Sequence, residues 1–197
     1  SPAEMSVIME RSMGYPLAMS ILCQQMQDGR RYGDAVDADV RRELFVHFRT
    51  AVYLRFEPPA RRLLLNLVPF EPFDVEFAQI LSGNSHAGEL LGELQQDTSM
   101  FLYDDLHHCR FLPDFRQYLL WQQEREYSAE EQNRLYSRAA LYYELHDDYK
   151  SALDCYTRCG EYQKVSDLLI KSSELHPGLA HYDEMEDYYR ALPREQV

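Results

Sequence analysis

The sequence predicts a mainly α-helical protein with one small β-hairpin, and three observations support this fold class. Apolar residues recur three to four positions apart along most of the chain, which is the period of an amphipathic helix. Two short runs of strand-forming residues flank Asp104-Asp105. Beyond Arg134 the sequence repeats itself, as stacked helical units do. The predicted order is a helical segment, a module that carries the hairpin, and helical repeats.

The first segment, residues 1–57, is expected to contain three helices, the first from Met5 to Ser12. Pro16 fits the first turn of the second helix, where the missing N–H of proline costs nothing, and Asp28-Gly29 closes that helix. A longer helix follows from Asp34 to Phe56. The residues expected to form its buried stripe are Val36, Val40, Leu44, Phe45, Phe48 and Val52.

The second segment, residues 58–127, is expected to form a separate module. Its expected elements are helices at Pro59–Leu67, Phe73–Leu81 and His86–Gln96, strands at Met100–Tyr103 and Cys109–Phe111, and a closing helix that opens at Pro113 and carries Phe115, Tyr118, Leu119 and Trp121. Three helices, a hairpin wing and a closing helix describe a winged-helix-like module.

The third segment, residues 128–197, begins with a capping box between Ser128 and Glu131. Within it Asp147-Asp148-Tyr149 recurs as Gly160-Glu161-Tyr162, and each turn is followed by a helix of about three turns. At the expected buried positions, Ala152 is equivalent to Val165, and Tyr156 is equivalent to Leu169. Such units cannot bury an apolar face alone, so they are expected to stack.

This pattern resembles the tetratricopeptide family, with an ordinary helical hairpin as the alternative. The residues at its small and aromatic packing positions are Tyr136, Ala139, Ala140, Tyr143, Tyr149, Ala152, Tyr156 and Cys159. Gly160 follows a helix end, where glycine adopts the left-handed conformation at least cost. A last helix, Ala180–Leu192, is expected in this tetratricopeptide-like arm.

Composition and charge limit the classes of function. The net charge of −13 argues against sequence-independent attraction to DNA phosphates and to anionic membranes. No apolar run approaches the roughly 18 residues of a membrane span and no signal peptide opens the chain, so a cytoplasmic protein is expected. Cys155 and Cys159 could share a helix face, but the four cysteines form no CxxC pair, and core packing is preferred to a metal site. The abrupt beginning and end suggest a fragment of a longer protein.

The order of these parts resembles one family. The stretches that carry the resemblance are Gly14-Tyr15-Pro16-Leu17-Ala18, LVPFEPFDVEFAQILSG (67–83), ELLGELQQDTSMFLYDD (89–105), CRFLPDFRQYL (109–119) and ALYYELHDDYKSALDCYTRCGEYQKVSDLL (140–169). Together they are similar to the central region of the MalT-like, LuxR-type ATP-dependent transcriptional regulators of bacteria, which belong to the signal-transducing STAND NTPases.

The resemblance implies a switch. In such regulators an N-terminal P-loop domain binds ATP or ADP, a winged helix holds the resting state closed, a helical arm receives an inducer or regulatory protein, and a C-terminal helix-turn-helix binds DNA. This chain has no G-x-x-x-x-G-K-[ST] loop, so ATP or ADP is expected in the full-length protein and no cofactor in this part. The expected function is signal transmission from the arm to the NTPase domain in cis. The alternative is a tetratricopeptide-like interaction scaffold with no role in transcription.

The resemblance also implies that Gly14, Tyr15 and Pro16, which match the family's GxP motif, lie near the nucleotide. The alternative is an ordinary helix start. Leu112 stands where many relatives have a histidine, just before the proline of the closing helix. Leucine cannot donate a hydrogen bond, so direct phosphate sensing by this module is not expected.

Direct DNA binding and catalysis are not expected of this chain. Residues 58–127 carry five arginines and eleven acidic residues, a net charge of −6, and Asp104-Asp105 would lie at the wing tip. Paired acids such as Glu130-Glu131 are usually solvated, and spacing alone assigns no catalytic Ser-His-Asp or Cys-His set. No catalytic residue and no metal ligand is therefore assigned.

The fifteen tyrosines indicate the remaining candidate surface. The residues expected to bind a partner or ligand are Tyr136, Tyr142, Tyr143, Tyr149 and Tyr156, with Tyr162 in the same stretch. Most of these rings must pack between helices. Any ring left on a concave face would suit recognition of a peptide or small ligand, because the ring buries area and its hydroxyl finds a partner.

Overall fold

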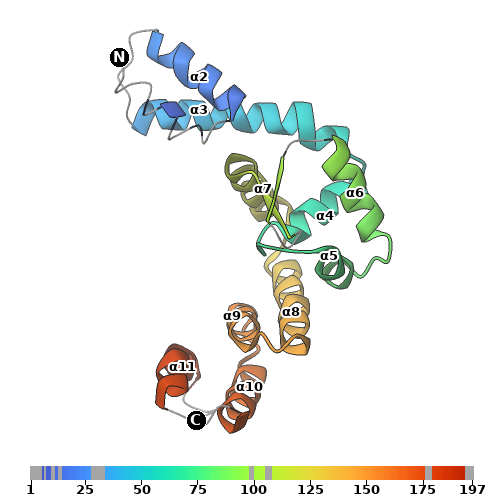
Figure 1. Ribbon diagram of the computed structural model, residues 1–197, viewed down its shortest axis with the longest axis vertical. Coiled ribbons are helices and arrows are strands. Elements are labelled where there is room, and N and C mark those ends of the chain that lie inside the picture. The colour runs from blue at the N-terminus through green and yellow to red at the C-terminus, as the bar shows by residue number, and fades with distance from the viewer. Residues whose placement is uncertain are drawn as a thin grey trace.

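The computed structural model describes residues 6, 8, 9, 12, 15–27, 34–97, 100–104, 108–175 and 179–193. The elements are α2 (Pro16–Gln27), α3 (Asp34–His47), the π-helical turn η1 (Phe48–Val52), the 3-10 turn η2 (Tyr53–Arg55), α4 (Pro58–Leu67), α5 (Val75–Ser82), α6 (Ala87–Asp97), β1 (Phe101–Tyr103), β2 (Cys109–Phe111), α7 (Pro113–Glu126), α8 (Ala129–Leu145), α9 (Tyr149–Cys159), α10 (Tyr162–Leu175) and α11 (Leu179–Ala191). The predicted fold class, mainly helical with a small antiparallel hairpin, is confirmed at this level. Figure 1 shows an elongated molecule with α2 and α3 at one end and α11 at the other. The described helices include none long and apolar enough to cross a membrane.

The N-terminal helices follow the sequence signals only in part. Helix α2 begins at Pro16, as predicted. Of the predicted helix Met5–Ser12, residues 6, 8, 9 and 12 are described and are helical, whereas Asp28-Gly29 lies outside the described residues. The long helix predicted from Asp34 to Phe56 is helical as far as Arg55, but it is not one regular α-helix, because α3 gives way to a π-helical turn and then a 3-10 turn.

The π-helical turn has a packing reason. Phe48 and Tyr53 are both buried, with 0% and 2% of their surfaces exposed. In a regular α-helix five residues exceed a full turn by about 140°, which would place these two rings on different sides. A π-helical turn takes more residues per turn and brings Tyr53 back toward the side of Phe48. Thr50 Oγ1 also donates to the Val46 carbonyl at 2.8 Å, a contact that often bends helices.

The central module, residues 58–127, contains α4–α7 and the hairpin. The predicted strands are confirmed, with Phe101 opposite Phe111 and Tyr103 opposite Cys109. The prediction that the second helix starts at Phe73 is wrong by two residues. Phe73 instead pairs with Cys109 in a β-bridge, and the Asp74 side chain caps α5 by accepting the Phe77 N–H at 2.7 Å.

An aromatic cluster joins the N-terminal helices to the central module. The Phe48 ring lies 5.3 Å from Phe115 and 6.0 Å from Tyr118, measured between ring centroids. Phe45 and Tyr53 meet the same Tyr118 ring at 5.6 and 5.8 Å. The cluster therefore spans the predicted boundary at 57/58, and the division into segments at that point stays a prediction.

The C-terminal helices α8–α11, here called the arm, carry the internal repeat. The capping box predicted at Ser128 is present, with both reciprocal hydrogen bonds. The equivalent repeat positions are equally buried: Ala152 and Val165 are 0% exposed, and Tyr156 and Leu169 are 1% exposed. Gly160 ends α9 in the left-handed conformation, with φ of 75°. The internal match therefore identified the buried face of both α9 and α10.

The hydroxyl groups of two tyrosines in the aromatic cluster, Tyr118 and Tyr53, differ in their hydrogen bonding and can be compared by substitution. The Tyr118 hydroxyl is buried without a hydrogen-bond partner among the described residues, whereas the Tyr53 hydroxyl donates to Glu126 at 3.1 Å. An unpaired buried hydroxyl is destabilising. Tyr118→Phe is therefore expected to raise the free energy of unfolding by about 1 kcal/mol, and Tyr53→Phe to lower it by about 1 kcal/mol, in urea denaturation. Equal losses in both variants would contradict this account of Tyr118.

Candidate functional site

The candidate functional site is the contact between the central module and the arm, here called the module junction. Its aromatic part consists of Phe70 and Phe77 from the module and Tyr136, Tyr142 and Tyr143 from α8. The Phe77 centroid lies 4.8 Å from that of Tyr142 and 5.5 Å from that of Tyr143, and the Phe70 centroid lies 5.2 Å from that of Tyr136. Phe77 is only 2% exposed, and it is covered by Phe70 of the module together with the two tyrosines of α8.

The polar part of the module junction is centred on Arg62 and Glu131. Arg62 Nη2 donates to Glu131 Oε1 at 2.8 Å, and its guanidinium lies over the Tyr127 ring, 4.1 Å from the centroid. Glu131 Oε2 also accepts the Ser128 N–H at 2.9 Å. The hydrogen bond from Arg62, followed by those from Ser128, lowers the pKa of Glu131 to about 2. The first turn of α8 is thus fixed to α4 by a carboxylate that stays charged over most of the pH range.

Two further contacts hold α5 to α8. Arg138 Nη1 donates to the Leu81 carbonyl at 3.3 Å, near the C-terminal end of α5, where a cation is favourable. His146 Nε2 lies 3.8 Å from Glu76 Oε2. Between these helices is a cavity of about 290 Å³. Its lining residues are Arg62, Asn66, Leu81, Ser82, Tyr127, Glu131, Arg134, Leu135 and Arg138.

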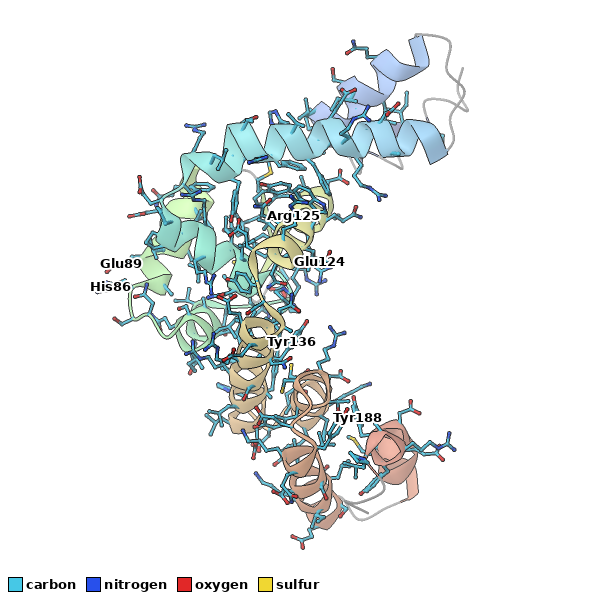
Figure 2. All side chains as sticks on the ribbon, turned by 180° about the vertical axis from the view of Figure 1, so that it is seen from behind. His86, Glu89, Glu124, Arg125, Tyr136 and Tyr188 are labelled. Atoms are coloured by element: carbon cyan, nitrogen blue, oxygen red, sulfur yellow. The ribbon has the colours of Figure 1, made fainter. Side chains whose placement is uncertain are left out.

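The structure places the predicted tyrosines mainly in packing roles. Tyr136, Tyr142 and Tyr143 pack at the module junction, and the Tyr136 hydroxyl accepts from Arg158 at 3.1 Å. Tyr156 is buried and donates to Glu144 at 3.0 Å, while the half-buried Tyr149 donates to Asp147 at 2.9 Å. Figure 2 shows Tyr136 on α8 and Tyr188 on α11. The five rings do not form one common surface, and a partner-binding role for any of them stays a prediction.

The residues predicted to lie near a nucleotide are only partly described. Gly14 lies outside the described residues. The Tyr15 ring stacks on Phe48, with centroids 5.9 Å apart, and Pro16 is exposed at the first position of α2. An exposed proline beside a packed tyrosine offers an apolar edge and no group that would hold a phosphate. A position near a nucleotide stays a prediction for Gly14, Tyr15 and Pro16, and we derive no nucleotide-dependent step from them.

The wing and the cysteines complete the set of predicted positions. Leu112 precedes α7, and its N–H donates to the Met100 carbonyl at 2.7 Å. Nearby in the hairpin, the backbone N–H of His108 donates to Asp104 Oδ1 at 2.9 Å. Burial raises the pKa of Cys155 to about 12, which keeps its thiol protonated. Among the described residues, no three His, Cys, Asp or Glu side chains are grouped to hold a metal ion.

No protein-family model matches this sequence, and a search of curated proteins finds no significantly similar sequence. The contacts themselves therefore carry the functional inference. The residues that sequence reasoning missed are Phe70, Phe77 and Arg62, each of which meets α8 or its cap. The only sequence signal for the first two was the aromatic spacing in FEPF and DVEF, which predicts burial and not the partner.

The first test of the module junction removes its central ring. Phe77→Ala is expected to lower the free energy of unfolding by about 3–5 kcal/mol, because a buried aromatic leaves a cavity. Phe77→Leu is expected to cost about 1 kcal/mol, since much of the volume remains. The matched control is Val75→Ala in the same helix, where the side chain is 47% exposed and the change should stay within about 0.5 kcal/mol. A Phe77→Ala loss no larger than the control would show that the junction is not packed as described.

The second test follows from the low pKa of Glu131. Because that pKa lies below the ordinary value of 4.5, the stabilisation is present above about pH 4.5 and is lost as pH falls toward about 2. Glu131→Gln keeps a capping side chain but loses the charge. The difference in Tm between wild type and this variant should be largest at neutral pH and should disappear near pH 2. Glu130→Gln, a neighbouring exposed position, should show no comparable difference, and a pH-independent effect of Glu131→Gln would contradict the ion pair.

Proposed function

We propose that this chain is the signal-transmitting central region of a LuxR-type, MalT-like transcriptional regulator. In this proposal the central module is a winged-helix-like domain, α8–α11 begin a tetratricopeptide-like arm, and the arm receives an inducer or regulatory protein. The N-terminal NTPase domain in cis is the second partner of the chain, and ATP or ADP belongs to the full-length protein. The resemblance of the ordered sequence stretches supports the proposal.

The observation that carries the proposal is the packing at the module junction. A signal passes between two parts of a protein only if a change in one part alters the contacts of the other. Phe77 inserts against Tyr142 and Tyr143, and Glu131 binds Arg62 at the first turn of α8. Packed interiors respond to displacement as close-packed solids do, so a movement of α8 would act directly on α4 and α5.

A scaffold function is the second candidate, and exposed apolar side chains favour it. Leu141, Leu145 and Ile170 are 50%, 69% and 56% exposed on α8 and α10. Exposed apolar residues on a helical repeat suit a protein partner. Both candidates therefore include a partner on the arm. They differ in whether occupation of the arm changes the rest of the protein.

The deciding experiment uses the full-length protein. The complete open reading frame is read for a P-loop before this region and a helix-turn-helix after it, and the purified protein is titrated with ATP and ADP by calorimetry and with duplex DNA by mobility shift. A full-length protein that lacks both domains establishes the scaffold instead. If both are present, Phe77→Leu should reduce the ATP-dependent change in DNA binding, whereas Val75→Ala should leave it unchanged. Equal behaviour of the two variants would show that the signal does not cross the module junction.

The present chain alone is expected not to bind duplex DNA. Its net charge is −13, and residues 58–127 carry −6, so the attraction to phosphates that supplies most non-specific affinity is missing. Fluorescence anisotropy with a labelled duplex at low and at physiological salt provides the measurement. Tight binding that weakens steeply with added salt would contradict the prediction and would make the central module itself a DNA-binding domain.

A further inference from the structure

An apolar groove lies between α3 and α7, away from the module junction. It is lined by Ala38, Arg41, Arg42, Phe45, Val46, Arg49 and Trp121, and its volume is about 350 Å³. The residues from α3 and η1 recur three and four positions apart, so they form one continuous stripe. Between Ala38 and Arg49 this stripe extends for about 16 Å, which is about three helical turns.

The floor of the groove is aromatic and aliphatic, and it is fixed by the core beneath it. The Phe45 centroid lies 5.5 Å from Trp121 and 5.6 Å from the buried Tyr118. Val46 is 59% exposed and Trp121 is 37% exposed. Large apolar side chains presented to solvent on a rigid base are typical of an interaction surface.

The rim of the groove is basic, although the protein as a whole is strongly acidic. Three arginines line the groove, and no carboxylate belongs to its lining among the described residues. Arg125 extends this rim, with its guanidinium over the Trp121 ring at 4.8 Å from the centroid. Figure 2 labels Glu124 and Arg125 on α7, beneath α3 in that view.

The acidic groups near the rim offset part of this charge. Asp39 accepts from Arg42 at 2.8 Å, and Glu124 is exposed beside Arg125. Burial raises the pKa of the Asp114 carboxyl, and the nearby Arg41 partly opposes this rise. No ion pair with a carboxylate is seen for Arg49 within the described part of the chain. The groove therefore combines an exposed apolar floor with a basic edge.

We propose that this groove binds an acidic amphipathic helix of a partner protein. Apolar side chains spaced three and four apart on such a helix would cover Phe45, Val46 and Trp121, in the helix-in-groove manner. Carboxylates on the flanks of the helix would meet Arg41, Arg42 and Arg49, and guanidinium groups bind carboxylates in a fixed two-pronged geometry. Tryptophan and arginine are also the residues that most often dominate the energy of an interface. This inference does not depend on the proposed function.

Charge and composition favour a peptide over a nucleic acid. A strand of nucleic acid would also satisfy the arginines, but a protein of net charge −13 repels a long polyanion. Stacking platforms for single strands use several exposed aromatic rings in succession, whereas the lining of the groove holds two aromatic rings, Trp121 and the half-buried Phe45. An acidic helix brings its negative charge and its apolar side chains together on one short segment, which matches both properties of the groove.

The single tryptophan makes the test direct, because the fluorescence of the chain reports on the groove itself. The probe is a synthetic helical peptide of about four turns, with leucines on one face and glutamates on its flanks. Saturable binding should shift the Trp121 emission to shorter wavelength, as the ring is removed from water. One control peptide carries lysine in place of every glutamate. The other keeps the composition of the probe but has its leucines spread around the helix. Both controls should bind at least roughly tenfold more weakly.

Variants of the protein locate the binding. Arg49→Glu should weaken the acidic peptide roughly tenfold or more, while Arg110→Glu, an exposed arginine on β2, should leave its affinity unchanged. Val46→Ser should weaken binding, while Leu102→Ser, an exposed apolar position on β1, should not. Circular dichroism confirms that each variant remains folded, since all four side chains are exposed.

Four outcomes would overturn the proposal. The first is the lack of a saturable shift up to about 1 mM peptide, which corresponds to only about 4 kcal/mol of binding energy. The second is equal binding of either control peptide. The third is tighter binding of a single-stranded oligothymidylate, which would make the groove a nucleic-acid site. The fourth is an emission shift that grows with protein concentration in the absence of peptide, which would identify a second copy of this chain as the occupant.

Discussion

The packing of Phe77 against Tyr142 and Tyr143 is the contact on which the placement of the arm depends. The buried apolar residues of the described chain form one continuous cluster that runs along this elongated protein, so no single centre holds all the helices (Figure 1). Burial at each step must then fix the next element. At this step the aromatic rings of α5 and α8 pack together, and the pair of Arg62 with Glu131 joins α4 to the first turn of α8.

Local features of the fold were predictable because their causes lie within a few residues. Pro16 and Pro113 begin helices, Ser128 and Glu131 form the capping box, and Gly160 takes the left-handed conformation. Each of these signals acts on the backbone next to it. The π-helical turn after α3 was not predictable, since its cause is the burial of Phe48 and Tyr53 against Tyr118, more than sixty residues later in the chain. The early start assigned to α5 fails for the same reason, because Phe73 pairs with the distant Cys109.

The candidate site was predictable only in its residue types. A cluster of tyrosines indicates that rings and hydroxyls will be used, but both buried and exposed tyrosines satisfy that pattern. Tyr142 and Tyr143 are adjacent in sequence, and the rings of both contact Phe77 of α5 from two successive positions of α8. Helical spacing alone cannot identify such a contact, since it requires the position of a second helix. Trp121 shows the opposite case, because its apolar type predicts burial whereas its ring is 37% exposed.

Helix α7 connects the groove with the module junction through side chains that are close in sequence. Tyr118 packs in the aromatic cluster, and Trp121 forms one wall of the groove. Gln123 donates to the Leu65 carbonyl at 2.6 Å, and Tyr127, which caps the helix, donates to Asn66 at 2.6 Å beneath Arg62. These hydrogen bonds fix α7 against α4 at the end that faces the arm. A ligand in the groove can displace α7 only if it binds more tightly when α7 is shifted than when α7 is in the position seen here. A ligand that met this condition and moved Trp121 would therefore strain the contacts that hold Arg62 and Glu131 in place.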